Sequence, residues 1–515
     1  MKPIRLIKGF LTVGLWTLMS RIMGFARDII IASRLGDGPI AEAFVVAFTL
    51  PNMFRRFFAE GAFNLAFIPI FSKKLEADDD PLTFARDAFA GLAGVLIVLT
   101  LLAQLVMPWM VLAMASGFAE DERLDLAVTF GRICFPYILF ISLAALLSGV
   151  LNATGRFAAA AAAPVLLNVV LVAAMLLAVQ MDWDFGLTLS WAVPVAGIAQ
   201  MVLVWIAASR AGFRLLPRWP HMTPELKRLA IIAAPAALSG GVLQVNLLVS
   251  RQVASYYDGA IQYLNLADRL YQLPLGVVAI AIGVVLLPDL SRRIQAGDEA
   301  GGRDALNRAA EFALFLTLPA AVALVLVAAP ITSVLYQRGA FGPEAAAATA
   351  LATSAYGLGL PAFVLQKVLQ PLFYARHDTR RPMNYALLTI GVNAAAAIGF
   401  SYLFGFVGAA LGTTLAAWAM VVLLWFGSRN MGDAARPDSR LLSRLPRMVA
   451  SAAIMGGVLL AANWLLADAL ATPGLRYIAL LGLVTAGIVS YFTAAELTGA
   501  MRIAELKASL RRRKA

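Results

Sequence analysis

Residues 20–32 read SRIMGFARDIIIA and lie inside an apolar segment, 11–33, that is long enough to cross a lipid bilayer. Three charged residues, Arg21, Arg27 and Asp28, interrupt this segment. A charged side chain at the centre of a bilayer costs about 2.5–3.5 kcal/mol on insertion scales, so such residues normally face a protein interior or a hydrated cavity. The stretch therefore predicts a membrane helix whose polar face is turned away from lipid.

The composition of the whole chain places it among polytopic membrane proteins. Of its 515 residues, 61% are hydrophobic and only 14% are charged, whereas a soluble domain carries about 25% charged residues. The single cysteine, Cys134, excludes a disulfide within the chain. The sequence contains no GxxxxGK[ST] loop, so we do not expect it to hydrolyse ATP.

Apolar runs of membrane-spanning length recur along the sequence and predict an all-α polytopic membrane protein with about 14 transmembrane helices. The basic N-terminus is followed by charged helical sequence without a small-residue cleavage site, so we interpret it as a retained first span. The predicted spans are 11–33, 40–71, 84–108, 127–151, 158–180, 187–208, 229–256, 270–290, 309–329, 346–374, 383–404, 407–427, 447–467 and 475–495.

The distribution of basic residues predicts the orientation of these spans. With the N-terminus in the cytoplasm, most Lys and Arg residues fall in cytoplasmic segments, including the pairs at 292–293 and 380–381. The external loops then contain Arg34, Arg123, Arg338 and Arg476. This bias follows the positive-inside rule and predicts that both termini are cytoplasmic.

Two halves of the chain resemble each other. Leu50-Pro51 and Leu273-Pro274 each open an apolar run that closes on Pro, two residues, Ser and two basic residues. Parallel six-span halves are typical of transporters, so we predict two pseudo-symmetric six-helix lobes followed by two additional C-terminal helices. The predicted organisation is an N-terminal lobe at 1–209, an interfacial connector at 210–228, a C-terminal lobe at 229–428, a cytoplasmic loop at 429–446, spans 13 and 14 at 447–496 and a basic cytoplasmic tail at 497–515.

Five arginines inside predicted spans require an explanation that does not involve lipid contact. They are Arg21, Arg27, Arg55, Arg56 and Arg269, and the acids available to pair with them are Asp28, Glu42, Glu60 and Asp268. One interpretation is a set of ion pairs that join helices. The other is a cationic cavity for an anionic ligand, because guanidinium groups bind phosphate and carboxylate through paired hydrogen bonds. Asn52, one turn before Arg55, would add hydrogen bonds in either case.

Four stretches carry a family resemblance. They are SRIMGFARD at 20–28, LPNMFRRFFAEGAFNLAFIPIF at 50–71, ADRLYQLPLG at 267–276 and YARHDTRRP at 374–382. They resemble the MurJ (MviN) lipid II flippases of the MOP exporter superfamily. The resemblance implies a fourteen-helix alternating-access transporter that moves an undecaprenyl-pyrophosphate-linked peptidoglycan precursor from the cytoplasmic to the periplasmic leaflet. It also implies that spans 13 and 14 form a groove for the polyprenyl tail.

The same resemblance assigns the substrate-binding residues. It implies that Arg21, Arg27, Asp28, Glu42, Arg55 and Arg269 surround a central cavity. Sequence position alone adds Asn52 to the predicted substrate-binding residues and predicts supporting ion pairs that involve Arg56, Glu60 and Asp268. Family members commonly have Asp at the position of Glu42, so this chain keeps the charge on a longer side chain. No catalytic or metal-binding residues are expected, and the chain is not expected to be an enzyme.

Substrate, energy source and partners follow from the same considerations. We expect lipid II and membrane lipids as partners, together with proteins of cell-wall synthesis, and no nucleic acid. No cofactor is expected, and transport would be driven by the membrane potential or by a monovalent cation. The predicted location is the bacterial inner membrane. Two alternatives remain open: a MOP-type exporter of another polyprenyl-linked glycan or of drugs, and a membrane enzyme acting on polyprenyl-phosphate sugars.

Overall fold

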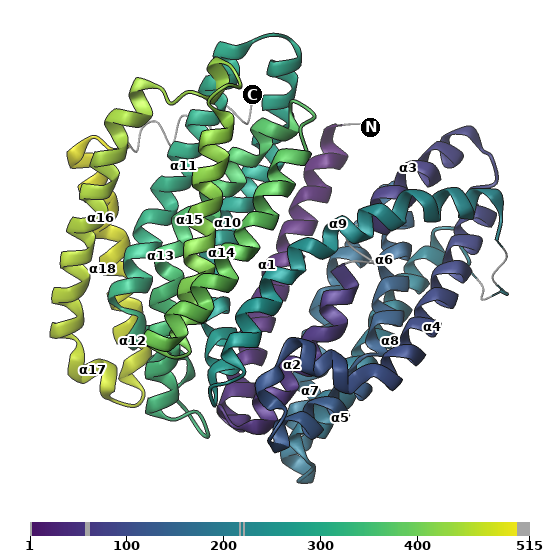
Figure 1. Ribbon diagram of the computed structural model, residues 1–515, viewed down its shortest axis with the longest axis horizontal. Helices are drawn as coiled ribbons and strands as arrows, with labels where there is room; N and C mark the ends of the chain where they lie inside the picture. Colours follow the sequence, from purple (N-terminus) through teal and green to yellow (C-terminus); the bar gives the residue numbers. More distant parts are fainter. Residues whose placement is uncertain (1–2, 57–61, 216–217, 220–221, 502–515) are drawn as a thin grey trace. The chain divides into compact units, whose positions relative to one another are not determined.

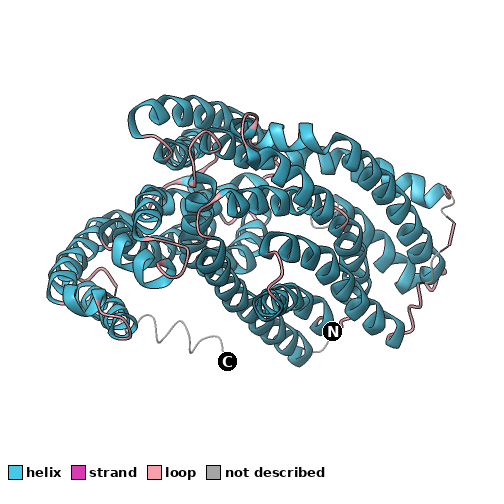
Figure 2. Ribbon diagram, turned by 90° about the horizontal axis from the view of Figure 1, so that it is seen from below, coloured by secondary structure: helices cyan, strands magenta, loops and turns pink. Residues whose placement is uncertain are grey.

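The computed structural model describes residues 3–56, 62–215, 218–219 and 222–501. Within these ranges the chain consists of helices and short loops and contains no strand, only an isolated β-bridge between Arg338 and Phe341 (Figure 2). This confirms the predicted all-α fold.

The described chain forms two compact units. Unit 1 comprises Met1–Gln262 and Arg338–Phe341, and unit 2 comprises Tyr263–Gln337 and Gly342–Ala515. The helices of unit 1 are α1 (Pro3–Leu35), α2 (Pro39–Arg55), α3 (Ala62–Ala77), α4 (Pro81–Met114), η2 (Ser116–Phe118), α5 (Glu122–Cys134), α6 (Tyr137–Ala153), α7 (Ala158–Met181), α8 (Phe185–Arg210) and α9 (Pro224–Ala254) (Figure 1).

Helix α10 (Ala260–Gln295) starts in unit 1 and continues into unit 2. The other helices of unit 2 are α11 (Glu299–Leu326), α12 (Ala328–Tyr336), α13 (Pro343–Tyr374), α14 (Arg380–Phe404), α15 (Val407–Ser428), η3 (Asp433–Ala435), α16 (Ser439–Leu465), α17 (Ala467–Ala471) and α18 (Leu475–Thr498).

Several of these helices begin at capping residues supplied by the local sequence. The side chains of Asp184, Thr223 and Asp438 accept hydrogen bonds from backbone amides three residues later. Such caps satisfy amides that have no partner inside the helix and are worth about 1 kcal/mol each.

Ten segments of the described chain are long and apolar enough to cross a membrane. They are Pro81–Met114, Glu122–Ala153, Ala158–Met181, Phe185–Arg210, Glu299–Leu326, Pro343–Tyr374, Arg380–Phe404, Val407–Ser428, Asp433–Leu465 and Leu475–Thr498. Each contains or largely overlaps one predicted span. The other four predicted spans, 11–33, 40–71, 229–256 and 270–290, fall on α1, on α2 with α3, on α9 and on α10. The total of fourteen stays a prediction.

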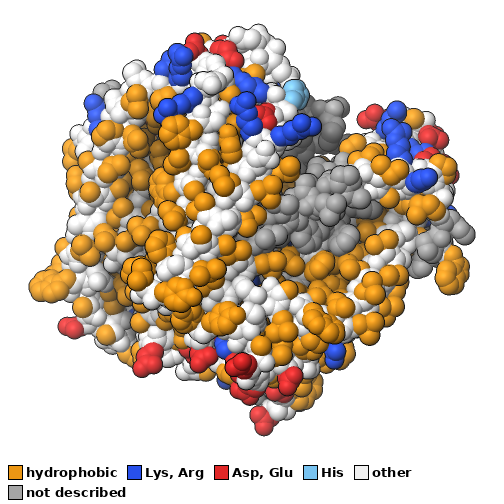
Figure 3. All heavy atoms as spheres, viewed as in Figure 1, with side chains coloured by type: hydrophobic (Ala, Val, Ile, Leu, Met, Phe, Trp, Pro, Cys, Tyr) orange, Lys and Arg blue, Asp and Glu red, His pale blue; other side chains and the backbone are white. Residues whose placement is uncertain are grey.

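The surface of these helices is suited to lipid. On α4, Leu105 is 70% exposed and Trp109 is 66% exposed, an arrangement that would be unfavourable in water but is natural in a bilayer. Along unit 2, hydrophobic side chains cover the length of the helices, while Lys and Arg gather at one end and Asp and Glu dominate the other (Figure 3). This asymmetry is the one the positive-inside rule describes.

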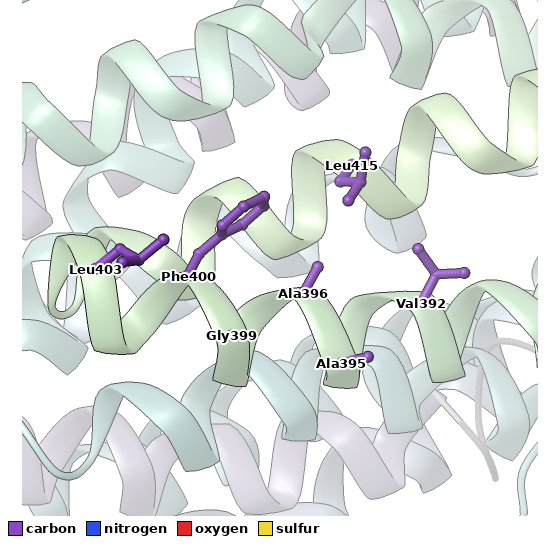
Figure 4. A pocket seen from close by; sticks show the side chains of 7 residues that line it. All are labelled: Val392, Ala395, Ala396, Gly399, Phe400, Leu403 and Leu415. Atoms are coloured by element: carbon purple, nitrogen blue, oxygen red, sulfur yellow. The ribbon is translucent and has the colours of Figure 1, made fainter.

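Two open apolar grooves lie on unit 2. The first, of about 530 Å³, lies between α14 and α15 and is lined by Val392, Ala395, Ala396, Gly399, Phe400, Leu403 and Leu415 (Figure 4). The second, of about 420 Å³, lies between α16 and α18. Neither groove is lined by a charged side chain. The two grooves therefore suit hydrocarbon chains, and a charged ligand would have to bind elsewhere in the molecule.

Helix α9 belongs to unit 1 by its contacts, although the sequence repeat places it in the second half of the chain. It packs on α3 and α4, and at its start the Lys74 Nζ lies 2.8 Å from Glu225 Oε1. Arg218, which precedes α9 in the chain, forms an ion pair with the buried Asp87 of α4. The compact units consequently have different boundaries from the two lobes predicted from the sequence.

A buried carboxylate attaches the additional C-terminal helices to unit 2. Glu311 of α11 is 2% exposed and forms ion pairs with Arg308 of its own helix and with Arg440 and Arg444 of α16. Helix α18 in turn packs on α16, and the two are drawn side by side in Figure 1. The pair is therefore anchored at the start of α16 by charge as well as by apolar packing.

Candidate substrate-binding site

The charged pair of α1 is buried inside unit 1. Arg27 is 6% exposed and Asp28 is 4% exposed. The Arg27 guanidinium donates two hydrogen bonds to Asp28 Oδ1, from Nε at 3.0 Å and from Nη2 at 2.7 Å. These two charges therefore do not face lipid, as the cost of burying a charge in hydrocarbon requires.

Two further helices complete the surroundings of Arg27. Its Nη1 donates to Oδ1 of Asn168 on α7 at 3.0 Å, and its guanidinium carbon lies 5.7 Å from the ring centroid of Phe48 on α2. The backbone oxygen of Phe48 accepts a hydrogen bond from Asn52 Nδ2 at 2.8 Å. The structure thus brings the α1 pair together with α7 and with the segment of α2 that precedes Arg55.

The remaining predicted arginines of unit 1 occupy more open positions. Arg21 lies on α1 with an exposed side chain, Arg55 is half-buried at the end of α2, and Arg56 is exposed. Glu60, the predicted partner of Arg56, lies outside the described residues. The predicted Arg56–Glu60 pair therefore stays a prediction.

Glu42 has partners that the sequence did not indicate. It is 1% exposed and accepts hydrogen bonds from Arg123 Nη1 at 2.9 Å and from the backbone amide of Ile261 at 3.0 Å. Arg123 also pairs with Asp121 at 2.6 Å and with Asp258 at 3.4 Å. These contacts join α2, α5 and the start of α10, and the role of Glu42 in binding substrate stays a prediction.

Sequence reasoning missed Arg123 because its neighbours in the chain are acidic and external, which is the ordinary pattern of a short loop. Arg251 was likewise not among the predicted site residues. In the structure Arg251 of α9 donates a hydrogen bond to Thr49 on α2. Nothing in the sequence selected Asn168 as a site residue, since a lone asparagine in an apolar helix most often serves helix packing.

Arg269 and Asp268 lie on the part of α10 that belongs to unit 2. Asp268 accepts a hydrogen bond from Gln272 one turn later. The ring of Tyr271 stacks on Phe363 with centroids 5.2 Å apart. The participation of Arg269 in one site with Arg27 and Arg55 stays a prediction.

The groups around Arg27 in unit 1 could bind an anion. A guanidinium fixed by a carboxylate and an amide is suited to an anion with several oxygens, because its remaining N–H groups form directed hydrogen bonds. Among the described residues, no group of three or more His, Cys, Asp or Glu side chains is placed to hold a metal ion.

The fold of this chain is shared with solved structures of membrane transporters. A solved structure described as lipid II flippase MurJ in an inward closed conformation superimposes with a TM-score of 0.80 at 24% identity, covering 95% of this chain and 98% of that one. An inward-facing MATE multidrug transporter of the MOP superfamily superimposes with a TM-score of 0.64 at 16% identity, covering 81% of this chain and 95% of the transporter. At these identities the likeness concerns the fold.

Sequence comparison identifies the family. A family model described as lipid II flippase MurJ matches residues 31–476. A probable lipid II flippase MurJ from Rhizobium meliloti (strain 1021) is 43% identical over 517 residues, covering 98% of this chain and 96% of that protein. The lipid II flippase MurJ of Burkholderia cenocepacia is 34% identical over 466 residues, covering 88% and 90% of the two chains. The chain belongs to the lipid II flippase MurJ family.

Proposed function

We propose that this protein translocates lipid II, the undecaprenyl-pyrophosphate-linked precursor of peptidoglycan, from the cytoplasmic to the periplasmic leaflet. The observation that carries the proposal is the buried Arg27 of α1, held by Asp28 and Asn168 inside a chain that belongs to the MurJ family along most of its length. The role is that of a transporter without a catalytic step.

In this proposal the substrate pyrophosphate binds to Arg27, Arg55 and Arg269 when the cavity is open to the cytoplasm. Asp28 takes two of the five guanidinium N–H groups of Arg27, so it fixes the direction in which the others point. Closure towards the cytoplasm and opening to the periplasm would carry the headgroup across while the polyprenyl tail remains in lipid. The tail has a natural route along the helices α16 and α18, whose groove is apolar.

The membrane potential is an adequate energy source for this step. Moving one elementary charge across the membrane changes the free energy by about 2.3 kcal/mol per 100 mV. A pyrophosphate carries several negative charges, so an inside-negative potential favours its outward movement. Coupling to a monovalent cation is the other expected source, and the two are separated by testing transport with an ionophore that collapses only the potential.

The proposed location is the bacterial inner membrane, with both termini in the cytoplasm. The asymmetric charge of unit 2 supports this orientation (Figure 3). Proteins of cell-wall synthesis are the proposed partners, because the translocated precursor is their substrate.

The test follows the substrate in the cells that make the protein. After depletion of the protein, the lipid II accessible to a reagent confined to the periplasm is measured, and the measurement is repeated with Arg27→Ala as the only copy. We expect accessibility to collapse in both cases. Arg436→Ala is the matched control, because Arg436 is 68% exposed and pairs with Asp433 at the surface, and it should restore accessibility fully.

Two results would contradict the proposal. Lipid II that stays accessible after depletion, in cells without a second flippase, would favour export of another polyprenyl-linked glycan or of drugs. Full activity of Arg27→Ala would instead refute the assignment of the site and favour a purely structural role for the α1 pair.

A further inference from the structure

Asn168 is placed between the binding arginine and the backbone of α1. It lies within α7, is 5% exposed, and makes three hydrogen bonds through its amide. Oδ1 accepts from Arg27 Nη1 at 3.0 Å, while Nδ2 donates to the backbone oxygens of Ser20 at 3.0 Å and Pro164 at 3.3 Å. Because the partners are one donor and two acceptors, only one orientation of the amide satisfies all three.

The contact with Ser20 brings Asn168 beside Gly24. In a regular helix the Ser20 oxygen accepts the hydrogen bond from the amide of Gly24, so Asn168 binds α1 at the turn that precedes Arg27. A Cβ added to Gly24 would lie 3.5 Å from Asn168 Nδ2. A methyl group therefore fits there, whereas a longer side chain would displace the amide.

The three contacts fix the rotation of the Arg27 guanidinium. Asp28 takes the N–H of Nε and one N–H of Nη2, and Asn168 takes one N–H of Nη1. A guanidinium has five N–H donors, so among the described contacts one N–H on each Nη remains for a ligand. Two donors on adjacent nitrogens suit two oxygens of one phosphate group.

We propose that Asn168 is a positioning residue that aims Arg27 at the substrate pyrophosphate and ties the guanidinium to the position of α1. This inference rests on the proposed function of Arg27. Asn168 acts through Arg27 and through Ser20. Its loss is therefore expected to weaken recognition of the diphosphate group more than attachment of the polyprenyl chain.

A packing role is the alternative, because the duplicated half carries an asparagine at the corresponding place. Asn393 of α14 follows Asn168 by 225 residues, the same interval that separates Pro136 from Pro361, and it is fully buried.

Gln200 of α8, also in unit 1, provides a control for a packing role. Its amide is also buried, donates to the Ala163 oxygen at 2.8 Å and accepts from the Tyr137 hydroxyl at 3.2 Å. Gln200 thus joins three helices without touching a charge.

The experiment measures binding of undecaprenyl pyrophosphate and undecaprenyl monophosphate to the purified full-length protein, together with its thermal unfolding. We expect Asn168→Ala to weaken pyrophosphate binding by about tenfold or more, the effect of a lost hydrogen bond to a charged group, and to weaken monophosphate binding less. Gln200→Ala should lower the unfolding temperature and leave both affinities within about twofold of the unchanged protein, because its hydrogen bonds involve no charged group.

A double-mutant cycle separates positioning from packing. If Asn168 acts through Arg27, Arg27→Ala and the Arg27→Ala/Asn168→Ala double variant should bind pyrophosphate equally weakly, because the second change removes an interaction already lost. Additive losses would overturn the proposal. Should Asn168→Ala not fold, Asn168→Asp replaces it: the new carboxylate competes with the substrate for Arg27 and should also weaken pyrophosphate binding.

The outcomes distinguish this inference from the function on which it rests. Unchanged pyrophosphate binding in Asn168→Ala or Asn168→Asp, with weakened binding in Arg27→Ala, would overturn the role of Asn168 alone. Unchanged binding in Arg27→Ala would overturn the proposed site itself.

Discussion

Replacing Arg123 by methionine is expected to destabilise the protein by about 3–5 kcal/mol, the usual result of leaving a buried charge without its partner. The magnitude depends on which of its three acidic neighbours is buried. The side chain of Glu42 is 1% exposed, whereas that of Asp121 is 38% exposed and that of Asp258 is 99% exposed. After the change, water can therefore solvate the carboxylates of Asp121 and Asp258. Most of the lost stability then arises from the buried carboxylate of Glu42.

Two further variants test this reasoning. Glu42→Gln/Arg123→Met removes both charges and keeps an acceptor for the Ile261 amide, so we expect it to recover more than half of the lost stability. Arg436→Met breaks a pair whose side chains are 68% and 62% exposed, and a surface pair of this kind is worth about 0–1 kcal/mol.

The assay is chemical unfolding of the purified full-length protein in detergent micelles, followed by circular dichroism. A loss below about 1 kcal/mol for Arg123→Met would show that the Glu42 carboxylate is solvated or paired elsewhere, since a buried pair costs more to break. A double variant no more stable than Arg123→Met would show that the loss comes from apolar contacts of the arginine stem. Either result would refute the argument.

Three further predictions concern other parts of the chain. Glu311→Gln removes the carboxylate that binds three arginines at the start of α16, and we expect about 3 kcal/mol of destabilisation and faster proteolysis of the segment 429–438. Gly117→Ala places a Cβ 2.4 Å from the Ser255 backbone and should lower the unfolding temperature, whereas Gly482→Ala, with nothing within 4 Å, should keep or raise it by improving helix propensity. Burial raises the pKa of Asp121, but hydrogen bonds from the side chain and backbone of Arg123 lower it more, so its pKa lies below the usual value of 3.8. Its contribution to stability is present above pH 4 and lost as the pH falls through the lowered pKa, and Asp121→Asn should remove this part of the acid sensitivity in unfolding measured from pH 6 to pH 3.

The sequence by itself determined the membrane class and the all-α fold. It also determined that the charges of Arg27 and Asp28 on α1 face away from lipid. Long apolar runs predict spans because a helix of about 20 residues matches the bilayer, and the ten apolar segments of the structure confirm those predictions. The Arg27–Asp28 pair was also predictable, since its members are adjacent in the chain. Local periodicity and the cost of burying a charge suffice for such conclusions.

Tertiary structure decided which distant groups complete the site. The partner of Glu42 is 81 residues away in Arg123, the amide that holds Arg27 is 141 residues away in Asn168, and Thr49 and Arg251 are separated by 202 residues. A helix sequence shows which of its faces is polar, but the residue that meets this face depends on how the helices pack. In a membrane every helix is similarly apolar on its outer surface, so hydrophobicity does not select neighbours. Close packing and buried hydrogen bonds make that selection, and they exist only after the chain has folded.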